Sequence, residues 1–279
     1  MSNVLEQDQP LNLSISLVCY KSDPQLLLCT LQSLQAALLY AQAQQPITAQ
    51  LTLVDNNGSD AELLHQLVQQ SGLAPVAEII CNQNNPGFGS ANNQVIDNAA
   101  SDYHLILNPD VELQNDALLV AISYLQQHRQ TVAVSPACQN GSGATEYLCK
   151  RYPGLFILLL RGFAPEWLKR RFQNALAHYQ YQELADSTEA TKVELISGCF
   201  MLCRTQALQQ VGGFDEAYFL YFEDFALSNA LGRLGDLCYL PTCRIVHHGG
   251  KAANKGLQHI GYFIRSAWHF YQSQGWKLW

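Results

Sequence analysis

The chain has 279 residues, of which 48% are hydrophobic and 14% charged, and its formal net charge is −7. This length and apolar content predict a folded chain with a large core and exclude disorder as its main state. The acidic balance excludes a nucleic-acid partner held by long-range attraction to phosphates. The longest strongly apolar run, at 155–160, is far shorter than the roughly 20 residues of a membrane-spanning helix.

The polar, acidic start at 1–10 lacks the basic and apolar pattern of a signal peptide. We therefore expect a protein of the cytoplasm. The nine cysteines form no CxxC pair. An odd number of scattered cysteines predicts reduced, mostly buried thiols rather than disulfides or zinc ligands.

Residues 10–135 alternate short β-rich apolar runs with longer segments of helical period. Such alternation predicts an α/β fold with a mostly parallel sheet and helices on both faces. Strands are expected at 13–20, 50–54, 78–81, 103–107 and 132–135, with a helix that starts at Pro24, one that ends at Gln70 and one at about 90–100.

The alternation stops after residue 135, and an aromatic and basic segment at about 136–192 is expected to be an insertion. The pattern returns at about 193–279. It begins with an apolar segment at 193–204 and continues with a helix near Glu223, a strand at 238–247 and a final amphipathic helix at 257–274. One domain over 1–279 is the simplest description.

Polar loops follow three consecutive predicted strands. The second strand ends in Asp55-Asn56-Asn57, the third in the loop 82–89, and the fourth in Asn108-Pro109-Asp110. Ligands of open parallel sheets bind beyond the carboxyl ends of the strands. Turn formation alone favours these residue types, but three such loops in succession favour a binding cleft. The loop with Gly87 and Gly89 opens a helix, and such a loop can hold the sugar and phosphates of a nucleotide.

Carboxylates and histidines follow two of the strands. Asp110 and Glu112 supply the hard oxygen ligands that Mg²⁺ or Mn²⁺ prefers beside a diphosphate, and a turn before the next helix explains them equally well. His247 and His248 end another strand. Because adjacent strand residues point to opposite faces, one of the two is expected to reach the cleft.

Glu223 and Asp224 follow an aromatic run at 218–222 and open a helix. The helix dipole alone favours carboxylates in a first turn. Apolar surroundings would also raise the pKa of such a carboxylate and make it a base near neutral pH. From the residues alone, both interpretations stay open.

In this order, the motifs resemble those of the inverting family 2 glycosyltransferases, especially the bacterial rhamnosyltransferases of O-antigen and cell-wall assembly. The resemblance covers most of the chain, and the ordered set is more specific than any single piece. The matching pieces are VDNN at 54–57, NPGFGSANN at 85–93, LNPD at 107–110, GCFML at 198–202, VGGFDE at 211–216, FLYFED at 219–224 and IVHH at 245–248.

The resemblance implies a GT-A fold and a nucleotide-sugar donor, with dTDP-rhamnose favoured. Asp55 would recognise the base of the nucleotide, Asp110 and His247 would hold Mg²⁺ or Mn²⁺ at the diphosphate, and Asp224, beside Glu223, would be the catalytic base. Transfer would invert the anomeric carbon in one displacement. The donor pocket would be lined by Asn57, Asn85, Gly87, Phe88, Gly89, Asn92, Asn93 and Asn108.

The chain departs from the family pattern at three places. Relatives often carry Ser or Thr shortly after the His, where Lys251 and Ala252 follow Gly249-Gly250 in this chain. Where relatives often read Glu-Asp-x-Asp-Leu, Ala226 replaces the second Asp, and Asn108-Pro109-Asp110 replaces Asp-x-Asp.

Two other functions compete with a transferase. A nucleotidyltransferase would need a glycine-rich and basic loop after the first strand, and residues 19–23 contain one lysine and no glycine. A non-catalytic sugar-binding protein would not need both Asp110 and Asp224.

Six of the 16 basic residues fall in 150–171, beside the run LFILLL, Phe163 and Trp167. Apolar and basic side chains together suit the surface of an anionic membrane, so a lipid-linked acceptor at the cytoplasmic face of the inner membrane is expected. The alternative is a buried apolar helix with a solvated basic rim, or a homodimer contact. The basic residues are Lys150, Arg151, Arg161, Lys169, Arg170 and Arg171.

Overall fold

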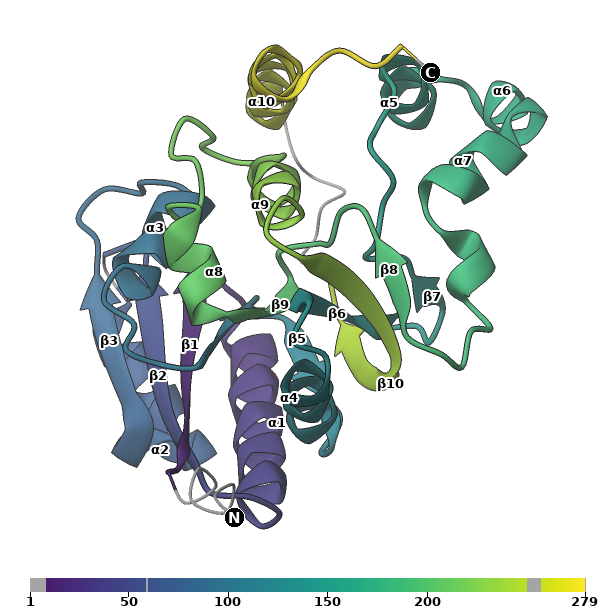
Figure 1. Cartoon of the computed structure of the whole chain (residues 1–279). Helices are drawn as coiled ribbons and strands as arrows, with labels where there is room; N and C mark the ends of the chain where they lie inside the picture. Colours follow the sequence, from purple (N-terminus) through teal and green to yellow (C-terminus); the bar gives the residue numbers. More distant parts are fainter. Residues whose placement is uncertain (1–8, 59, 250–256, 279) are drawn as a thin grey trace.

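The computed structural model describes residues 9–58, 60–249 and 257–278. Within these ranges, ten strands form one sheet in the order β3-β2-β1-β4-β9-β6-β10-β5, with β7 paired to β6 and β8 paired to β10 (Figure 1). Helices lie on both faces of the sheet, as the sequence predicts.

The first half of the sheet is parallel. Strands β1 (Leu11–Cys19), β2 (Ile47–Asp55), β3 (Ala77–Cys81) and β4 (Tyr103–Leu107) alternate with helices α1 (Pro24–Gln42), α2 (Ala61–Ser71) and α3 (Phe88–Ile96), and the short η1 (Ala74–Val76) precedes β3. The side chain of Asp23 caps α1 by accepting hydrogen bonds from two backbone N–H groups, and Pro24 opens the helix.

Helix α3 begins and ends earlier than the predicted 90–100. Gly87 adopts φ +96° at its N-cap, a left-handed conformation that glycine adopts without strain and that lets the helix begin at once. Asp97 and Asn98 then end it, because such side chains favour turns over helix interiors.

The second half of the sheet is mixed, which qualifies the prediction of a mostly parallel sheet. β6 (Thr131–Asn140) and β10 (Asp236–His247) are parallel, whereas β9 (Phe200–Arg204) runs antiparallel between β4 and β6. The apolar segment 193–204 divides into β8 (Thr191–Val193) and β9, which pair with different strands. Antiparallel β5 (Val111–Leu113) pairs with β10, and β7 (Thr145–Glu146) pairs with β6.

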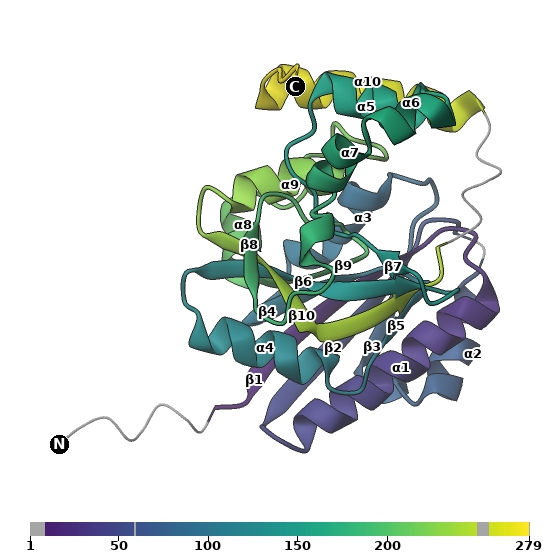
Figure 2. The ribbon, with the colours of Figure 1, turned by 90° about the vertical axis from the view of Figure 1, so that its right-hand side faces the viewer.

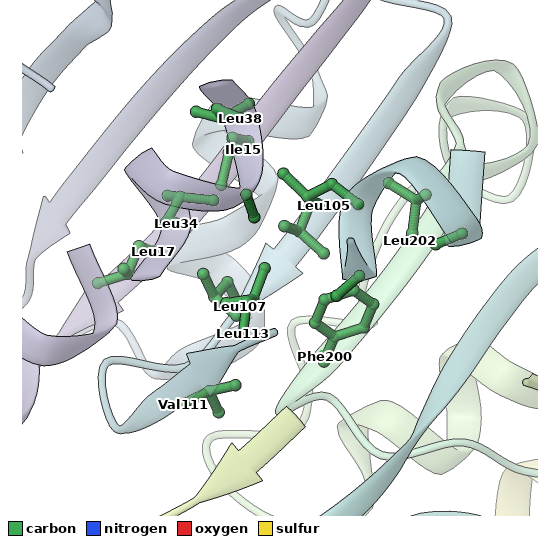
Figure 3. Packing of buried hydrophobic residues seen from close by; sticks show 14 of the residues in the cluster. Ile15, Leu17, Leu34, Leu38, Leu105, Leu107, Val111, Leu113, Phe200 and Leu202 are labelled. Atoms are coloured by element: carbon green, nitrogen blue, oxygen red, sulfur yellow. The ribbon is translucent and has the colours of Figure 1, made fainter. Parts of the chain in front are cut away.

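Alternate residues of the central strands fill two cores. On one face, Leu105 and Leu107 of β4 pack with Leu34 and Leu38 of α1 and with Phe200 of β9 (Figure 3). Helices α1 and α4 (Ala117–Gln127) cover this face. On the other face, the intervening strand residues Ile106 and Met201 are buried in a second cluster with residues of α3, α8 (Thr205–Gln210) and α9 (Glu223–Leu231). This alternation follows from the two-residue period of a strand.

Helices from the insertion and the chain end form a layer over the carboxyl edge of the sheet (Figures 1 and 2). They are α5 (Leu155–Phe163), α6 (Glu166–Arg171), α7 (Gln173–Tyr179), with η2 (Gln182–Leu184), and α10 (Leu257–Gln274). An aromatic cluster that includes Phe222 and Phe270 joins α9 to α10. In the part of the chain that the structure describes, no helix is both long enough and apolar enough to cross a bilayer.

Candidate active site

The turn after β2 is ordered by Asp55. Its buried carboxylate accepts hydrogen bonds from the backbone N–H groups of Asn57 at 2.8 Å and Asp60 at 3.1 Å. The side chain of Asn57 donates to the Asp60 carboxylate at 3.1 Å. Asp55 therefore shapes the end of β2 directly, and its contact with a nucleotide base stays a prediction.

The loop after β3 is a closely packed glycine loop, defined here as residues 85–89. The side-chain oxygen of Asn85 accepts the N–H of Gly87 at 3.0 Å and an amide hydrogen of Asn56. A Cβ at Gly87 would lie 2.6 Å from the carbonyl oxygen of Phe219, and one at Gly89 would lie 2.8 Å from Cβ of Phe214. Both glycines are therefore needed for the glycine loop to pack against the segment before α9.

Asn92 and Asn93 are in the interior, and their expected place in the lining of the donor pocket stays a prediction. Asn92 is 0% exposed; it accepts a hydrogen bond from Ser16 at 2.6 Å and donates to the carbonyl of Phe88. Asn93 donates to the carbonyl of Phe214 and accepts from its N–H, both at 2.8 Å. These amides lie on the buried face of α3, where they join α3 to β1 and to the segment before α9.

The side chain of His247 faces the carboxylate of Asp110, whereas His248 reaches Asp110 only through its backbone N–H, which donates to the Asp110 carbonyl. Nε2 of His247 lies 3.4 Å from Oδ1 of Asp110, and its Nδ1 lies 3.0 Å from the Glu146 carboxylate. His248 instead contacts Glu112 at 2.7 Å. The antiparallel pairing of β5 with β10 sets this arrangement, because it places the end of β10 beside the loop of Asp110.

The pair Asp110 and His247 fits a divalent cation. Mg²⁺ and Mn²⁺ at nucleotide sites are held by one or two protein groups together with phosphate oxygens. Among residues 9–58, 60–249 and 257–278, no group of three or more Asp, Glu, His or Cys side chains is arranged to hold a metal ion. Glu146 on Nδ1 of His247 would orient the ring and leave Nε2 for the cation. Asn108 adjoins this site, where its backbone N–H bonds to the carbonyl of Cys199.

Burial lowers the pKa of His247, but the hydrogen bonds that its ring donates to Asp110 and Glu146 outweigh burial and raise that pKa to about 9. The imidazole is therefore held by two anions when no cation is bound. A divalent cation at Nε2 would displace the proton there and pair with Asp110, while Glu146 would stay on Nδ1.

Asp224 lies in a pocket of about 460 Å³ at the start of α9. Its Oδ2 accepts the backbone N–H of Gly198 at 3.2 Å, and its Oδ1 accepts the N–H of Phe225 at 2.9 Å. Two residues directly before α9, Tyr221 and Phe222, have φ of 70° and 66°. Left-handed conformations cost free energy for such bulky residues and are retained where the surrounding structure requires them.

The pocket shifts the protonation of its acids and its lysine. Burial raises the pKa of Asp224. Burial, and next the charge of Asp224, raise the pKa of Glu223 to about 8, and its buried Oε2 has no hydrogen-bond partner. Burial, and next the charge of Arg161, lower the pKa of Lys150 to about 8. Both oxygens of Asp224 accept backbone hydrogen bonds, which favour its charged form, so Glu223 is the more readily protonated of the two acids.

The expected basic patch is divided in the structure. Lys150 is only 8% exposed and lines the Asp224 pocket with Arg161, away from the exposed basic side chains of α6. Its place in an acceptor or membrane patch stays a prediction. Arg151 stacks over Tyr181 with 3.8 Å between the guanidinium carbon and the ring centroid. It also pairs with Glu183. On α6, Lys169 pairs with Glu166, and exposed side chains include Arg170, Arg171 and Trp167.

One cavity thus borders both ends of the candidate site. Asp224 and Glu146 line it together, and Glu146 contacts His247, which faces Asp110. Sequence reasoning missed Glu146, because a single acid after a Gly/Ser turn has no motif around it. It also missed Tyr179 and Phe263, which reach the pocket from α7 and α10.

Several proteins are similar to this chain. The family described as Glycosyl transferase family 2 matches residues 14–212. N-acetylglucosaminyl-diphospho-decaprenol L-rhamnosyltransferase of Mycobacterium tuberculosis (strain ATCC 25618 / H37Rv) is 27% identical over 229 residues, which are 76% of this chain and 70% of the relative. Rhamnosyltransferase WbbL of Escherichia coli (strain K12) is 27% identical over 208 residues, 70% of this chain and 72% of the relative.

Two solved structures share the fold. The mannosyltransferase PcManGT from Pyrobaculum calidifontis, in complex with GDP-Man and Mn²⁺, has a TM-score of 0.58 at 16% identity and covers 95% of this chain and 64% of its own. GalNAc-T7 with UDP, GalNAc and Mn²⁺ has a TM-score of 0.63 at 15% identity over 87% of this chain. This chain spans only 44% of the GalNAc-T7 chain.

The sheet order and these neighbours show the GT-A fold. The match over residues 14–212 is more specific. The chain belongs to glycosyl transferase family 2, and among the relatives named above it is similar to rhamnosyltransferases.

Proposed function

We propose that this glycosyltransferase transfers L-rhamnose from dTDP-rhamnose, with inversion, to a lipid-linked saccharide in bacterial surface-polysaccharide synthesis. One observation carries the proposal. Asp224 and Glu146 line a single cavity, and Glu146 contacts His247, whose ring faces Asp110. A base and a diphosphate site at one cavity are what a single displacement at an anomeric carbon requires.

In the proposed reaction, Asp224 accepts the proton of an acceptor hydroxyl while the oxygen bonds to the anomeric carbon. The bond from that carbon to the donor diphosphate breaks, and the nucleoside diphosphate leaves from the opposite face. Gly198 and Phe225 hold the carboxylate in place through their N–H groups. A divalent cation held by Asp110 and His247 would stabilise the charge of the leaving diphosphate.

The donor and acceptor are proposed from the relatives. Both relatives are named as rhamnosyltransferases, and one is named for a diphospho-decaprenol acceptor. We infer that the acceptor here is also a saccharide linked through a diphosphate to a lipid. Transfer would then occur at the cytoplasmic face of the inner membrane, where such an acceptor and a nucleotide sugar meet.

A donor screen with stereochemical analysis tests this proposal. The purified chain is heated with dTDP-rhamnose, dTDP-glucose, UDP-glucose or GDP-mannose, with Mn²⁺ or with EDTA. A ligand at 100 times its Kd adds about 2.7 kcal/mol to the free energy of unfolding, so dTDP-rhamnose with Mn²⁺ should raise Tm most. NMR of the product should show inversion. Retention of configuration, or equal stabilisation by all four donors, would contradict the proposal.

A further inference from the structure

Figure 2 shows the layer that contains α5 and α10. Large apolar side chains are exposed on these helices and in the segment after α10. Ile264 and Trp268 of α10 are both 57% exposed, Phe163 of α5 is 61% exposed, and Trp276 after α10 is 51% exposed. Apolar side chains gathered in this way mark a binding surface more strongly than isolated ones.

An apolar groove of about 190 Å³ lies in this layer, and we name it the α5–α10 groove. Its walls include Leu155, Leu159, Phe163, Ile264, Trp268 and Trp276. Leu158 and Phe263 line both this groove and the pocket of Asp224. The groove and the catalytic pocket therefore share a wall.

Two cations line the pocket near that wall. Arg161 is one helical turn after Leu158 on α5, so the two side chains lie on the same side of the helix. Lys150 donates a hydrogen bond to the carbonyl of Tyr147. Burial, and next the repulsion from Arg161, lower the pKa of Lys150, while the charges of Glu146 and Asp224 raise it. An anion bound between the cations would remove that repulsion.

We propose that this path binds the acceptor as an amphiphile, with its phosphate at Arg161 and Lys150 and the start of its hydrocarbon chain in the α5–α10 groove. The inference rests on the proposed function and adds the residues that recognise the lipid part of the acceptor. The pocket contains the base and the two cations, and the α5–α10 groove adjoins it at Leu158 and Phe263. The matching groups in the ligand are a sugar hydroxyl, a phosphate and a hydrocarbon.

Because the α5–α10 groove adjoins the pocket of Asp224, the hydrocarbon of the acceptor is favoured over two other occupants of the groove. A bilayer or a second copy of the protein would need only the exposed apolar side chains. Neither would explain why the groove shares Leu158 and Phe263 with the catalytic pocket, or why cations line that pocket.

The test compares three probes by isothermal calorimetry in EDTA, which removes cation-dependent binding at the donor site. The probes are farnesyl diphosphate, inorganic diphosphate and farnesol. If phosphate and chain bind together, farnesyl diphosphate should bind at least about tenfold more tightly than either part, because burying even two methylenes contributes that much. Equal affinity for farnesyl diphosphate and inorganic diphosphate would overturn the proposal.

Paired variants test which residues bind the phosphate of the probe and which bind its hydrocarbon chain. Ile264→Gln should weaken farnesyl diphosphate binding at least about threefold and leave inorganic diphosphate unchanged. Its control is Leu39→Gln, since Leu39 is equally exposed, at 56%, on distant α1. Arg161→Gln should weaken both anionic probes, and Arg129→Gln, at an exposed position after α4, should weaken neither. If Ile264→Gln binds farnesyl diphosphate as tightly as the wild-type protein does, the proposal is overturned.

Two further readouts separate the alternatives. Light scattering that shows a dimer lost in Ile264→Gln, with farnesyl diphosphate binding intact, would assign the groove to an interface between copies. Vesicle flotation lost in the same variant, with that binding intact, would assign it to a bilayer. Both results overturn the proposal. Donor stabilisation by dTDP-rhamnose is scored separately, so a failed groove and a failed transferase assignment give different results.

Discussion

Gly198 lies between the proposed base and the glycine loop. Its backbone N–H donates to Oδ2 of Asp224 at 3.2 Å, and a Cβ at this position would lie 3.2 Å from Cε1 of Phe88 and 3.5 Å from Cβ of Asp224. Phe88 in turn packs edge-on against Phe214, with 5.7 Å between the ring centroids. The orientation of the base therefore depends on how closely β9 approaches α3.

Gly198→Ala should lower kcat by about tenfold, because a displacement of the base by a fraction of an ångström costs much of its positioning. Steady-state kinetics with dTDP-rhamnose measures this. Gly261→Ala, on α10 where an added Cβ meets nothing within 4 Å, is the control. It should keep kcat and gain about 0.5–1 kcal/mol in the free energy of unfolding. Equal kinetics for the two variants would contradict the proposed contact.

Asp224→Asn should keep donor-induced stabilisation and lose at least about a hundredfold in transfer rate, the usual scale for a positioned general base. Radiolabelled sugar transfer gives the rate, and a thermal shift with donor gives binding. Asp97→Asn, at an exposed acid after α3, should keep the wild-type rate. Near-normal transfer by a folded Asp224→Asn would rule out the base.

Glu223→Gln should remove a pH dependence of stability. The folded pKa of Glu223, about 8, is raised above its ordinary value of 4.5. The folded chain therefore binds more protons than the unfolded chain between these values, and the free energy of unfolding should fall as pH rises from about 4.5 to about 8. Urea unfolding at intervals from pH 5 to 9 should show a shallower fall for Glu223→Gln. Glu62→Gln, at the start of α2, should keep the wild-type slope.

His247→Ala and His248→Ala are a matched pair, because the side chain of His247 faces the Asp110 carboxylate and that of His248 pairs with Glu112. His247→Ala should weaken Mn²⁺-dependent donor binding by at least about tenfold, the lower scale for disturbing a metal site. His248→Ala should change it little. Titration of dTDP-rhamnose with Mn²⁺ and with EDTA measures both. The same loss in the two variants would contradict the assignment of His247.

Asn93→Ala should act on stability rather than on donor recognition. The substitution leaves the N–H and carbonyl of Phe214 without their amide partner. Each buried polar group left without a partner costs roughly 1–3 kcal/mol. Tm should therefore fall, while the KM for donor, measured below the new Tm, should stay within about twofold. A large increase in KM with unchanged Tm would instead support a place for Asn93 in the donor pocket.

The parallel half of the fold can be predicted from the sequence because its signals are local. Apolar strands end in polar loops, and Asp55, Asp110 and His247 fall at those ends. The position of β9 between β4 and β6 cannot be predicted in this way. It depends on pairing between residues about a hundred positions apart, which no local period records.

Lys150 shows the same limit within the candidate site. The sequence places it beside Arg151 in a basic cluster, but Lys150 forms a β-bridge with Leu195. Extended neighbours point to opposite sides, so Lys150 enters the pocket while Arg151 lies over Tyr181. The bridge partner Leu195, which sets the side that Lys150 faces, is in another part of the chain.

The sheet order has a consequence for synthesis on the ribosome. Among the described strands, β6 pairs with short β7, with β9 and with β10. β10 begins at Asp236, long after β6 ends at Asn140. At translation rates of about 5–20 residues per second, the nascent β6 waits roughly 5–20 seconds for its main neighbour. During that delay, its apolar edge is exposed to other nascent chains, so a cellular chaperone is most useful while residues 141–236 are being made.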